Sequence, residues 1–243
     1  MNRAVAVQLA PVLDVRTHAD APEQARALAR ATAERLRTGI RVRGAASLVV
    51  PGGRTPAAFL RELSCANIDW QYVQVTLTDE RWVDAAFPDS NEKQVRDNLL
   101  CGAARKASFV YLKTAHEDPR AALAARTRAL LAMARPFDAV VLGMGDDGHI
   151  GSLFPGASCL PRAMDPHAEP ALVAISPPRA PHRRISFNLP ALLDARHIAI
   201  LVRGGAKLEI LQRAAAEFSS PLELPVTAIV TQTRAPVEVH WTG

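Results

Sequence analysis

The chain has 243 residues with a formal net charge of +5, and 49% of its residues are hydrophobic. This composition is typical of a folded globular protein and excludes disordered and fibrous classes. No apolar run is long enough to span a membrane, and the N-terminus lacks the apolar core of a secretion signal, so we expect a cytoplasmic protein. The three cysteines form no C-x-x-C pair, which agrees with a reducing compartment.

The positive charge does not by itself indicate a nucleic-acid partner. The basic residues are scattered along the chain, and aromatic residues, at 5%, leave little surface for base stacking. A small anionic substrate explains a mild positive excess equally well. We therefore expect a small-molecule partner and neither nucleic acid nor membrane.

Hydrophobic periodicity predicts helices and strands that alternate along the chain. A helix capped by Asp20 runs to about Leu36. The following elements are a strand at Ser47–Val50, a helix at Pro56–Leu63, a strand at Tyr72–Thr78, a helix at Glu92–Leu100 capped by Asp89-Ser90-Asn91, a strand at Ser108–Leu112, a helix at Pro119–Met133 and a strand at Ala139–Leu142. The later elements are strands at Leu172–Ile175, Arg184–Asn188, Ile198–Val202 and Val237–Trp241, and a helix at Ala206–Phe218.

This alternation predicts an α/β protein with a mostly parallel sheet covered by helices on both faces. We expect one domain over residues 1–243, with the proline-rich segment Pro155–Pro181 as an excursion or flap. Loops that follow parallel strands meet at one edge of the sheet, where α/β proteins bind their ligands.

One such loop follows the strand at Ala139–Leu142 and contains two carboxylates and the imidazole of His149. The spacing of Gly143, Gly145 and Gly148 matches a dinucleotide-binding fingerprint, but Asp146 and Asp147 would place negative charges where the phosphates bind. We therefore expect no nicotinamide or flavin cofactor. His149 is a candidate catalytic residue, although a histidine hydrogen-bonded inside a tight loop is an alternative interpretation.

Two earlier loops belong to the same edge. Gly52-Gly53-Arg54-Thr55 precedes a helix, where free N–H groups attract a phosphate, although a plain tight turn is an alternative. Asp79 and Arg81 follow the next strand and offer a carboxylate and a guanidinium, although a surface turn would look the same. Arg184 lies where a strand begins, and Lys207 lies where a strand joins a helix; each is either a phosphate ligand or a solvated charge.

Taken together, these segments resemble the 6-phosphogluconolactonase family, within the group that also includes glucosamine-6-phosphate deaminases. The resemblance is carried by Pro51–Pro56, Asp79–Val83, Asp89–Asn91, Leu142–Pro155, Arg184–Ser186 and Gly204–Lys207. It implies a three-layer, Rossmann-like α/β/α fold. It also implies hydrolysis of 6-phospho-D-glucono-1,5-lactone to 6-phospho-D-gluconate in the oxidative pentose phosphate pathway, with no redox cofactor and no required metal.

Two alternatives to the lactonase are open at this stage. Deaminases have a glutamate in the loop after the histidine, whereas this chain continues Ile150-Gly-Ser-Leu-Phe-Pro155. A non-catalytic sugar-phosphate sensor usually carries an added DNA-binding domain, for which we expect no room in 243 residues. The chain also departs from the family pattern at Pro51, usually a serine, at Asp84, often proline, and at Phe87, often histidine.

Our mechanistic hypothesis makes His149 the general base that draws a proton from water, with Asp147 orienting the imidazole. Asp79 would hold sugar hydroxyls or water, and Arg81 with loop N–H groups would stabilise the oxyanion. The phosphate would lie between Gly52–Thr55, Arg184 and Lys207. A zinc site at Asp79 and His149 has no support from an H-E-x-x-H motif, and no G-x-S-x-G elbow occurs. We expect a monomer or a weak homodimer.

Overall fold

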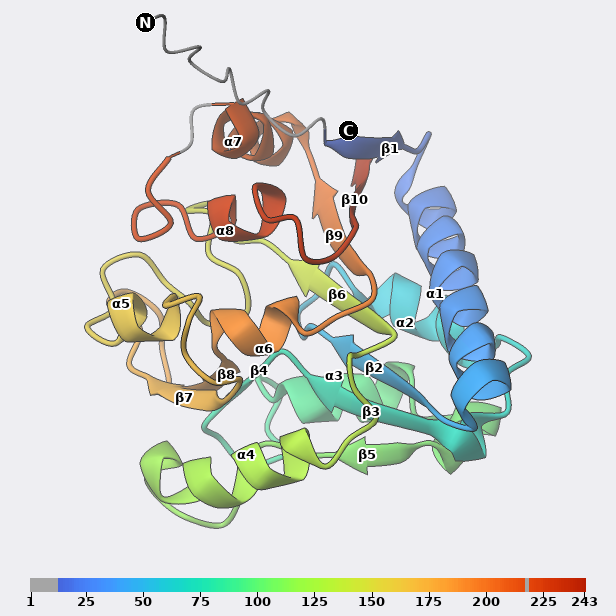
Figure 1. The fold of residues 1–243 in the computed structure, drawn as a ribbon. Helices are drawn as coiled ribbons and strands as arrows, with labels where there is room; N and C mark the ends of the chain where they lie inside the picture. Colours follow the sequence, from blue (N-terminus) through green and yellow to red (C-terminus); the bar gives the residue numbers. More distant parts are fainter. Residues whose placement is uncertain (1–12, 217–218) are drawn as a thin grey trace, which may run out of the picture.

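The computed structural model describes residues 13–216 and 219–243, and its centre is a sheet of parallel strands in the order β1-β10-β9-β6-β2-β3-β5 (Figure 1). The strands are β1 (Asp14–Thr17), β2 (Ala46–Val50), β3 (Val73–Leu77), β5 (Ser108–Val110), β6 (Ala139–Gly143), β9 (Ile198–Arg203) and β10 (Val237–Thr242). Every neighbouring pair in this sheet is parallel. The predicted mostly parallel α/β sheet is confirmed.

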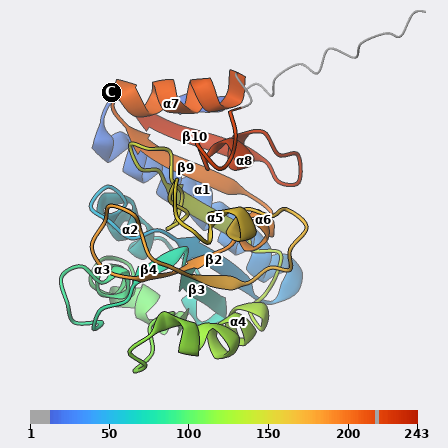
Figure 2. The ribbon, with the colours of Figure 1, turned by 90° about the vertical axis from the view of Figure 1, so that its left-hand side faces the viewer.

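Helices cover both faces of the sheet (Figures 1 and 2). On one face lie α1 (Ala21–Arg43), α2 (Ala57–Ser64) and α3 (Asn91–Asn98), which pack side by side. The other face carries α4 (Leu123–Leu131), α6 (Leu189–Leu193), α7 (Gly205–Ala216) and α8 (Thr227–Val230). Shorter turns are η1 (Trp70–Tyr72), η2 (Gly102–Lys106), η3 (Pro119–Ala122) and α5 (Leu160–Ala163). Because both faces are covered, central segments such as Leu48–Val50 and Val140–Leu142 are fully buried and apolar throughout.

A second, small sheet is antiparallel and was not predicted. It contains β4 (Asp79–Arg81), β8 (Arg184–Phe187) and β7 (Leu172–Ile175), in that order. The strands at 172–175 and 184–188 were expected from the sequence, but β4 lies in a segment expected to be a loop. Alternation of polar and apolar residues indicates that a segment is extended, but not which strand it pairs with. The second sheet therefore could not be predicted from the sequence.

The ends of several elements differ from the prediction. Helix α1 continues past Leu36 to Arg43 and ends at Gly44, whose φ of 76° is left-handed and whose N–H donates to the carbonyl of Ile40. The predicted helix at 119–133 is divided into η3 and the shorter α4. Helix α7 is described to Ala216, so its predicted end at Phe218 lies outside the described residues. Strand β1, short, polar and at the sheet edge, gave no apolar signal.

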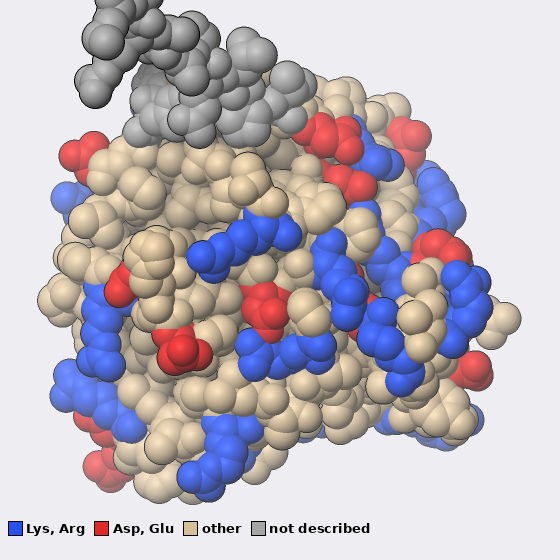
Figure 3. Space-filling view, viewed as in Figure 1, with Lys and Arg blue, Asp and Glu red and all other residues tan. Residues whose placement is uncertain are grey.

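Basic side chains gather over α1 on the face in Figure 3, where acidic side chains lie among them, and those of α1 itself are all arginines. Several are paired: Arg35 with Glu238, Arg37 with Glu34, and Arg43 with the buried Asp138. Such pairing removes much of the field that an uninterrupted basic surface would present to a polyanion. Across residues 13–216 and 219–243, no helix has the length and apolar character needed to cross a membrane.

His240 in β10 predicts how stability depends on pH. Its side chain is buried, its Nδ1 lies 3.1 Å from Nε2 of His18, and burial lowers its pKa from 6.5 to about 4. The unfolded chain therefore takes up this proton first, and the free energy of unfolding falls as the pH drops from about 6.5 toward 4, by at most about 3 kcal/mol. His240→Gln should flatten this part of the curve, measured by urea unfolding at several pH values. His167→Gln, which alters an exposed histidine, should leave the curve as steep as in the unmodified protein.

Candidate active site

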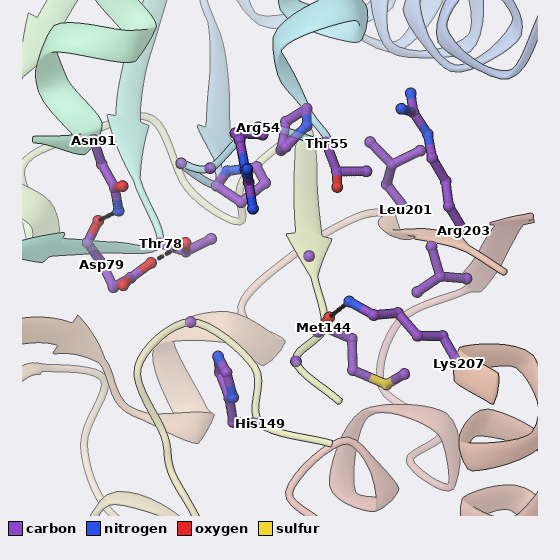
Figure 4. A pocket seen from close by; sticks show the side chains of 18 of the residues that line it. Arg54, Thr55, Thr78, Asp79, Asn91, Met144, His149, Leu201, Arg203 and Lys207 are labelled. Atoms are coloured by element: carbon purple, nitrogen blue, oxygen red, sulfur yellow. Dashed lines mark hydrogen bonds between the residues drawn. The ribbon is translucent and has the colours of Figure 1, made fainter. Parts of the chain in front are cut away.

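The order of the strands reverses direction between β2 and β6. From β2 the chain moves outward to β3 and β5, and from β6 it moves the other way to β9 and β10. At such a point the loops after the two strands separate and leave a crevice at their carboxyl ends. A cleft of about 320 Å³ lies there (Figure 4). It is lined by Pro51–Pro56, Thr78, Asp79, Arg81, Asn91, Gly143–Gly145, His149, Gly151, Leu201–Arg203 and Lys207.

His149 enters the cleft from the loop after β6. The loop is closed by hydrogen bonds from the Gly145 N–H to the carbonyl of His149 (3.0 Å) and from the Gly148 N–H to the carbonyl of Gly145 (3.1 Å). Gly148 has a φ of 74°, which disfavours other residues. The ring of Phe154 packs on the imidazole at 4.2 Å between centroids. The imidazole therefore has a fixed position and points into the cleft (Figure 4).

Asp147 determines which imidazole nitrogen carries the proton. Its Oδ1 lies 2.5 Å from Nδ1 of His149, and an ionised carboxylate only accepts hydrogen bonds. Nδ1 is thus the protonated nitrogen and Nε2 keeps a lone pair for a proton from substrate or water. The same hydrogen bond lowers the pKa of Asp147. Asp147 is not among the lining residues of the cleft, so it acts on the imidazole rather than on a ligand.

Asp79 is a buried carboxylate with both oxygens engaged. The Thr78 hydroxyl donates to Oδ1 at 2.9 Å, and the Ser152 hydroxyl donates to Oδ2 at 2.5 Å. The Ser152 N–H in turn donates to the hydroxyl of Ser186 in β8 (3.1 Å). These contacts connect the loop that carries His149 to the small sheet. Ser152 was not predicted as a site residue, because nothing along the chain places it next to Asp79.

The neighbouring residues Glu80 and Arg81 have different tasks. The Glu80 carboxylate accepts the N–H groups of Asn91 (2.7 Å) and Glu92 (2.6 Å), so it holds the start of α3. Burial raises the pKa of Glu80 to about 7, although these N–H donors oppose the rise. Arg81 lines the cleft, and its Nη1 donates to the carbonyl of Asp89 at 2.5 Å.

The loop after β2 requires glycine at two positions. Gly53 has a φ of 102°, and a Cβ on Gly52 would lie 1.9 Å from Oδ1 of Asn91. Asn91, which the sequence analysis treated as part of a helix cap, lines the cleft, and its Nδ2 donates to the carbonyl of Asp79 (2.9 Å). The cap itself is Ser90, whose hydroxyl accepts from the Lys93 N–H. Close contact between the two loops leaves the backbone before α2 and the side chain of Thr55 facing the cleft.

The two basic residues predicted to bind phosphate, Lys207 and Arg184, differ in their position relative to the cleft. Lys207 reaches into the cleft, where its Nζ donates to the carbonyl of Met144 at 2.6 Å and lies 3.3 Å from Oδ1 of Asp146. Arg184, opposite Arg81 in the β4–β8 pair, is buried with 6% exposure and does not line the cleft. Its Nε and Nη1 have no hydrogen-bond partner within the described residues, and burial lowers its pKa.

The structure thus gathers Asp79, Arg81, His149, Lys207 and Gly52–Thr55 around one cleft, whereas the half-exposed Asp147 and the buried Arg184 do not line it. Arg203 also lines the cleft, although the sequence analysis gave it no binding role. Its sequence signal was its position directly after the predicted strand at Ile198–Val202 and before a Gly-Gly pair.

Comparisons with known proteins point to one family. Residues 19–241 match the family model described as glucosamine-6-phosphate isomerases/6-phosphogluconolactonase. A 6-phosphogluconolactonase of Pseudomonas aeruginosa is 41% identical over 223 residues, 91% of either chain. One from Rhizobium meliloti is 39% identical over 217 residues, 89% of this chain and 93% of the relative. The crystal structure of a 6-phosphogluconolactonase from Shewanella baltica matches with a TM-score of 0.91 and 37% identity, covering 95% of this chain and 98% of that one.

Gly145→Ala tests the geometry around the imidazole. A Cβ at this position would lie 2.1 Å from Nδ1 and Cε1 of His149 and 2.8 Å from Oδ1 of Asp147, so the hydrogen-bonded pair cannot keep its geometry. We expect the fold to persist, because a side chain rather than backbone yields, while the NMR signals of the His149 ring nitrogens shift with loss of the Asp147 contact. Gly205→Ala, where a Cβ meets nothing within 4 Å, is the matched control. Unchanged ring signals in Gly145→Ala would contradict this description of the loop.

Proposed function

The chain belongs to the glucosamine-6-phosphate isomerase/6-phosphogluconolactonase family, and on that premise we propose that it hydrolyses 6-phospho-D-glucono-1,5-lactone to 6-phospho-D-gluconate in the oxidative pentose phosphate pathway. Its relatives are named 6-phosphogluconolactonases, which are lactone hydrolases, and this chain is an enzyme of the same class. The observation that carries the proposal is the meeting of an imidazole and a phosphate-type loop, about a hundred residues apart in sequence, on one cleft.

His149 is the proposed general base. Because Asp147 engages Nδ1, the free Nε2 takes a proton from a water molecule as the water oxygen attacks the lactone carbonyl carbon. The tetrahedral intermediate then collapses with cleavage of the bond from that carbon to the ring oxygen. The ring oxygen takes the proton back from the imidazolium, which returns His149 to its starting state. No covalent intermediate with the enzyme is required.

Arg81 is the proposed stabiliser of the oxyanion. The N–H groups of Gly145, Gly148 and His149 are engaged within their own loop, so they are not free to bind a carbonyl oxygen. Arg81 lines the cleft, and among the described residues its guanidinium donates to protein through Nη1 alone, to the carbonyl of Asp89. Asp79 is proposed to orient a sugar hydroxyl or the attacking water, since carboxylate oxygens keep further lone pairs after accepting from Thr78 and Ser152.

The phosphate is proposed to bind between Gly52–Thr55 and Lys207. The N-terminus of α2 and the Lys207 ammonium both favour a dianion there. Arg184 stays a predicted phosphate ligand. Two of its nitrogens have no hydrogen-bond partner within the described residues, which supports a ligand role. Its side chain does not line the cleft, so it would have to move to reach a bound phosphate. Binding energy at this remote group would hold the lactone in place for attack.

We further propose a cytoplasmic enzyme that is active as a monomer or a weak homodimer. The cysteines are free, and Cys65 and Cys101 are exposed, which suits a reducing environment.

Replacement of His149 tests the activity directly. We expect the purified protein to hydrolyse freshly prepared 6-phosphogluconolactone faster than its spontaneous rate, and His149→Ala to lower kcat by about 10² to 10⁴. Asp147→Asn should lower kcat as well, because an amide no longer selects the Nδ1-protonated imidazole. A pH-stat or a coupled dehydrogenase measures both. Ammonia release from glucosamine 6-phosphate, without lactone hydrolysis, would reject the lactonase in favour of a deaminase.

Replacement of Lys207 tests the phosphate site. Lys207→Ala should raise KM about tenfold or more with a smaller change in kcat, because the ammonium binds ground and transition states alike. Lys106→Ala, which alters an exposed lysine outside the cleft, is the control and should match the unmodified enzyme. If KM in Lys207→Ala stays unchanged, the phosphate binds elsewhere.

A further inference from the structure

Arg203, the last residue of β9, is held in an unusual way at the edge of the cleft. Its Nε donates to Oε1 of Gln24 in the first turn of α1, at 3.0 Å. Within residues 13–216 and 219–243, no carboxylate forms an ion pair with Arg203, and neither Nη1 nor Nη2 has a hydrogen-bond partner. The guanidinium is therefore positioned through one nitrogen while its two terminal nitrogens stay available.

The orientation of Gln24 is fixed by its other contacts. Its side chain has 0% exposure, and its Nε2 donates to the carbonyls of Val202 and His240, both at 2.8 Å. Carbonyls only accept hydrogen bonds, so the amide nitrogen must face them and the amide oxygen must face Arg203. A buried amide without hydrogen bonds would lower the stability of the fold. Here the hydrogen bonds of Gln24 fix its amide oxygen in one orientation, and that oxygen fixes the position of Arg203.

The charge balance of the cleft indicates an anion. The side chains of Arg54, Arg81, Arg203 and Lys207 line it, against one lining carboxylate, Asp79, whose oxygens already accept two hydroxyls. Asp146, which does not line the cleft, lies 3.3 Å from the Lys207 ammonium, and the remaining balance is still positive. Asp79 lies on one side of the cleft, whereas Arg203 and Lys207 lie on the other (Figure 4). Arg203 is therefore on the side of the proposed phosphate, not beside the carboxylate.

We propose that Arg203, positioned by Gln24, is a second cationic ligand of the substrate phosphate and that it makes this cleft selective for phosphorylated over unphosphorylated lactones. This inference rests on the proposed function for the identity of the substrate. A planar guanidinium donates two parallel hydrogen bonds to phosphate oxygens, a geometry that the Lys207 ammonium does not offer. Lys207 moreover donates to the carbonyl of Met144 and lies 3.3 Å from the carboxylate of Asp146, so its single charge does not neutralise the dianion.

Steady-state kinetics of Arg203→Ala test the proposal. We expect KM for 6-phosphogluconolactone to rise about tenfold, with kcat within about twofold, because the contact is remote from the reacting carbonyl. Hydrolysis of glucono-1,5-lactone, which has no phosphate, should be unchanged. The matched control is Arg213→Ala, an exposed arginine on α7 that does not line the cleft. An unchanged KM, or an equal loss with both lactones, would overturn the proposal.

Binding of inorganic phosphate gives a readout that does not depend on turnover. Phosphate should raise the unfolding temperature of the unmodified protein and bind Arg203→Ala about tenfold more weakly, as measured by thermal shift and calorimetry. If the unmodified protein binds phosphate through Arg203 but hydrolyses no lactone, the proposed function fails and the phosphate contact stands. Equal phosphate affinity in the two proteins would reject the contact whatever the activity.

A double-mutant cycle tests the positioning role of Gln24. Gln24→Leu removes the acceptor of the Arg203 Nε, so it should weaken phosphate binding alone but add nothing in the Arg203→Ala background. Additive losses would show that Gln24 acts on structure in general. If Gln24→Leu does not fold, Arg203→Lys replaces it in the test, because this variant keeps the charge but not the planar guanidinium. If Arg203→Lys bound phosphate as tightly as the unmodified protein, a role for the positioned guanidinium would be contradicted.

Discussion

The reversal of strand order between β2 and β6 is the constraint on which the rest of the structure depends. Two parallel strands lie side by side while the chain leaves them in opposite directions, so the loops after them cannot pack together. The glycine-rich segment after β2 and the histidine loop after β6 therefore face each other across open space. Without the reversal, helices would cover both loops and no cleft would bring an imidazole opposite a phosphate-type loop.

The small antiparallel sheet gives this cleft its rigidity. Strand β4 continues directly from β3 and pairs with β8, which places Asp79 and Ser186 where the histidine loop passes. Ser152 contacts both residues, so the loop after β6 is fixed to strands β4 and β8. Catalysis requires side chains held close to their working geometry, and here the support comes from buried hydroxyl–carboxylate contacts rather than from the loop alone.

Charge is distributed so that the two ends of the cleft have different tasks. Near Asp79, both carboxylate oxygens accept hydroxyl donors, and Arg81 donates to the carbonyl of Asp89 through Nη1. The rest of that guanidinium suits a small transient oxyanion on a neutral lactone ring. On the opposite side lie two cations, which suits a permanent dianion: Arg203, held through Nε, and Lys207, which donates to the Met144 carbonyl and lies 3.3 Å from Oδ1 of Asp146. Both cations are positioned by hydrogen bonds to residues far away in the sequence, Lys207 by the Met144 carbonyl and Arg203 by Gln24. The first contact joins α7, and the second α1, to the carboxyl ends of the strands.

The sequence by itself determined the alternation of helices and strands, the parallel sheet, the His149 loop, the glycine loop and the α3 cap, because these depend on local periodicity, glycine and capping residues. The edge strand β1 and the boundaries of α1 and α4 were missed, since polar edge segments and exposed last turns carry little apolar signal. Only the tertiary structure decided the pairing of β4 with β8, the burial of Arg184, the Ser152–Asp79 contact and the support of Arg203 by Gln24. Each of these joins residues far apart along the chain, such as the 179 positions between Gln24 and Arg203. A period of two or 3.6 residues reports which face of an element is buried but not what lies against it, so such contacts follow from the packing of the whole sheet.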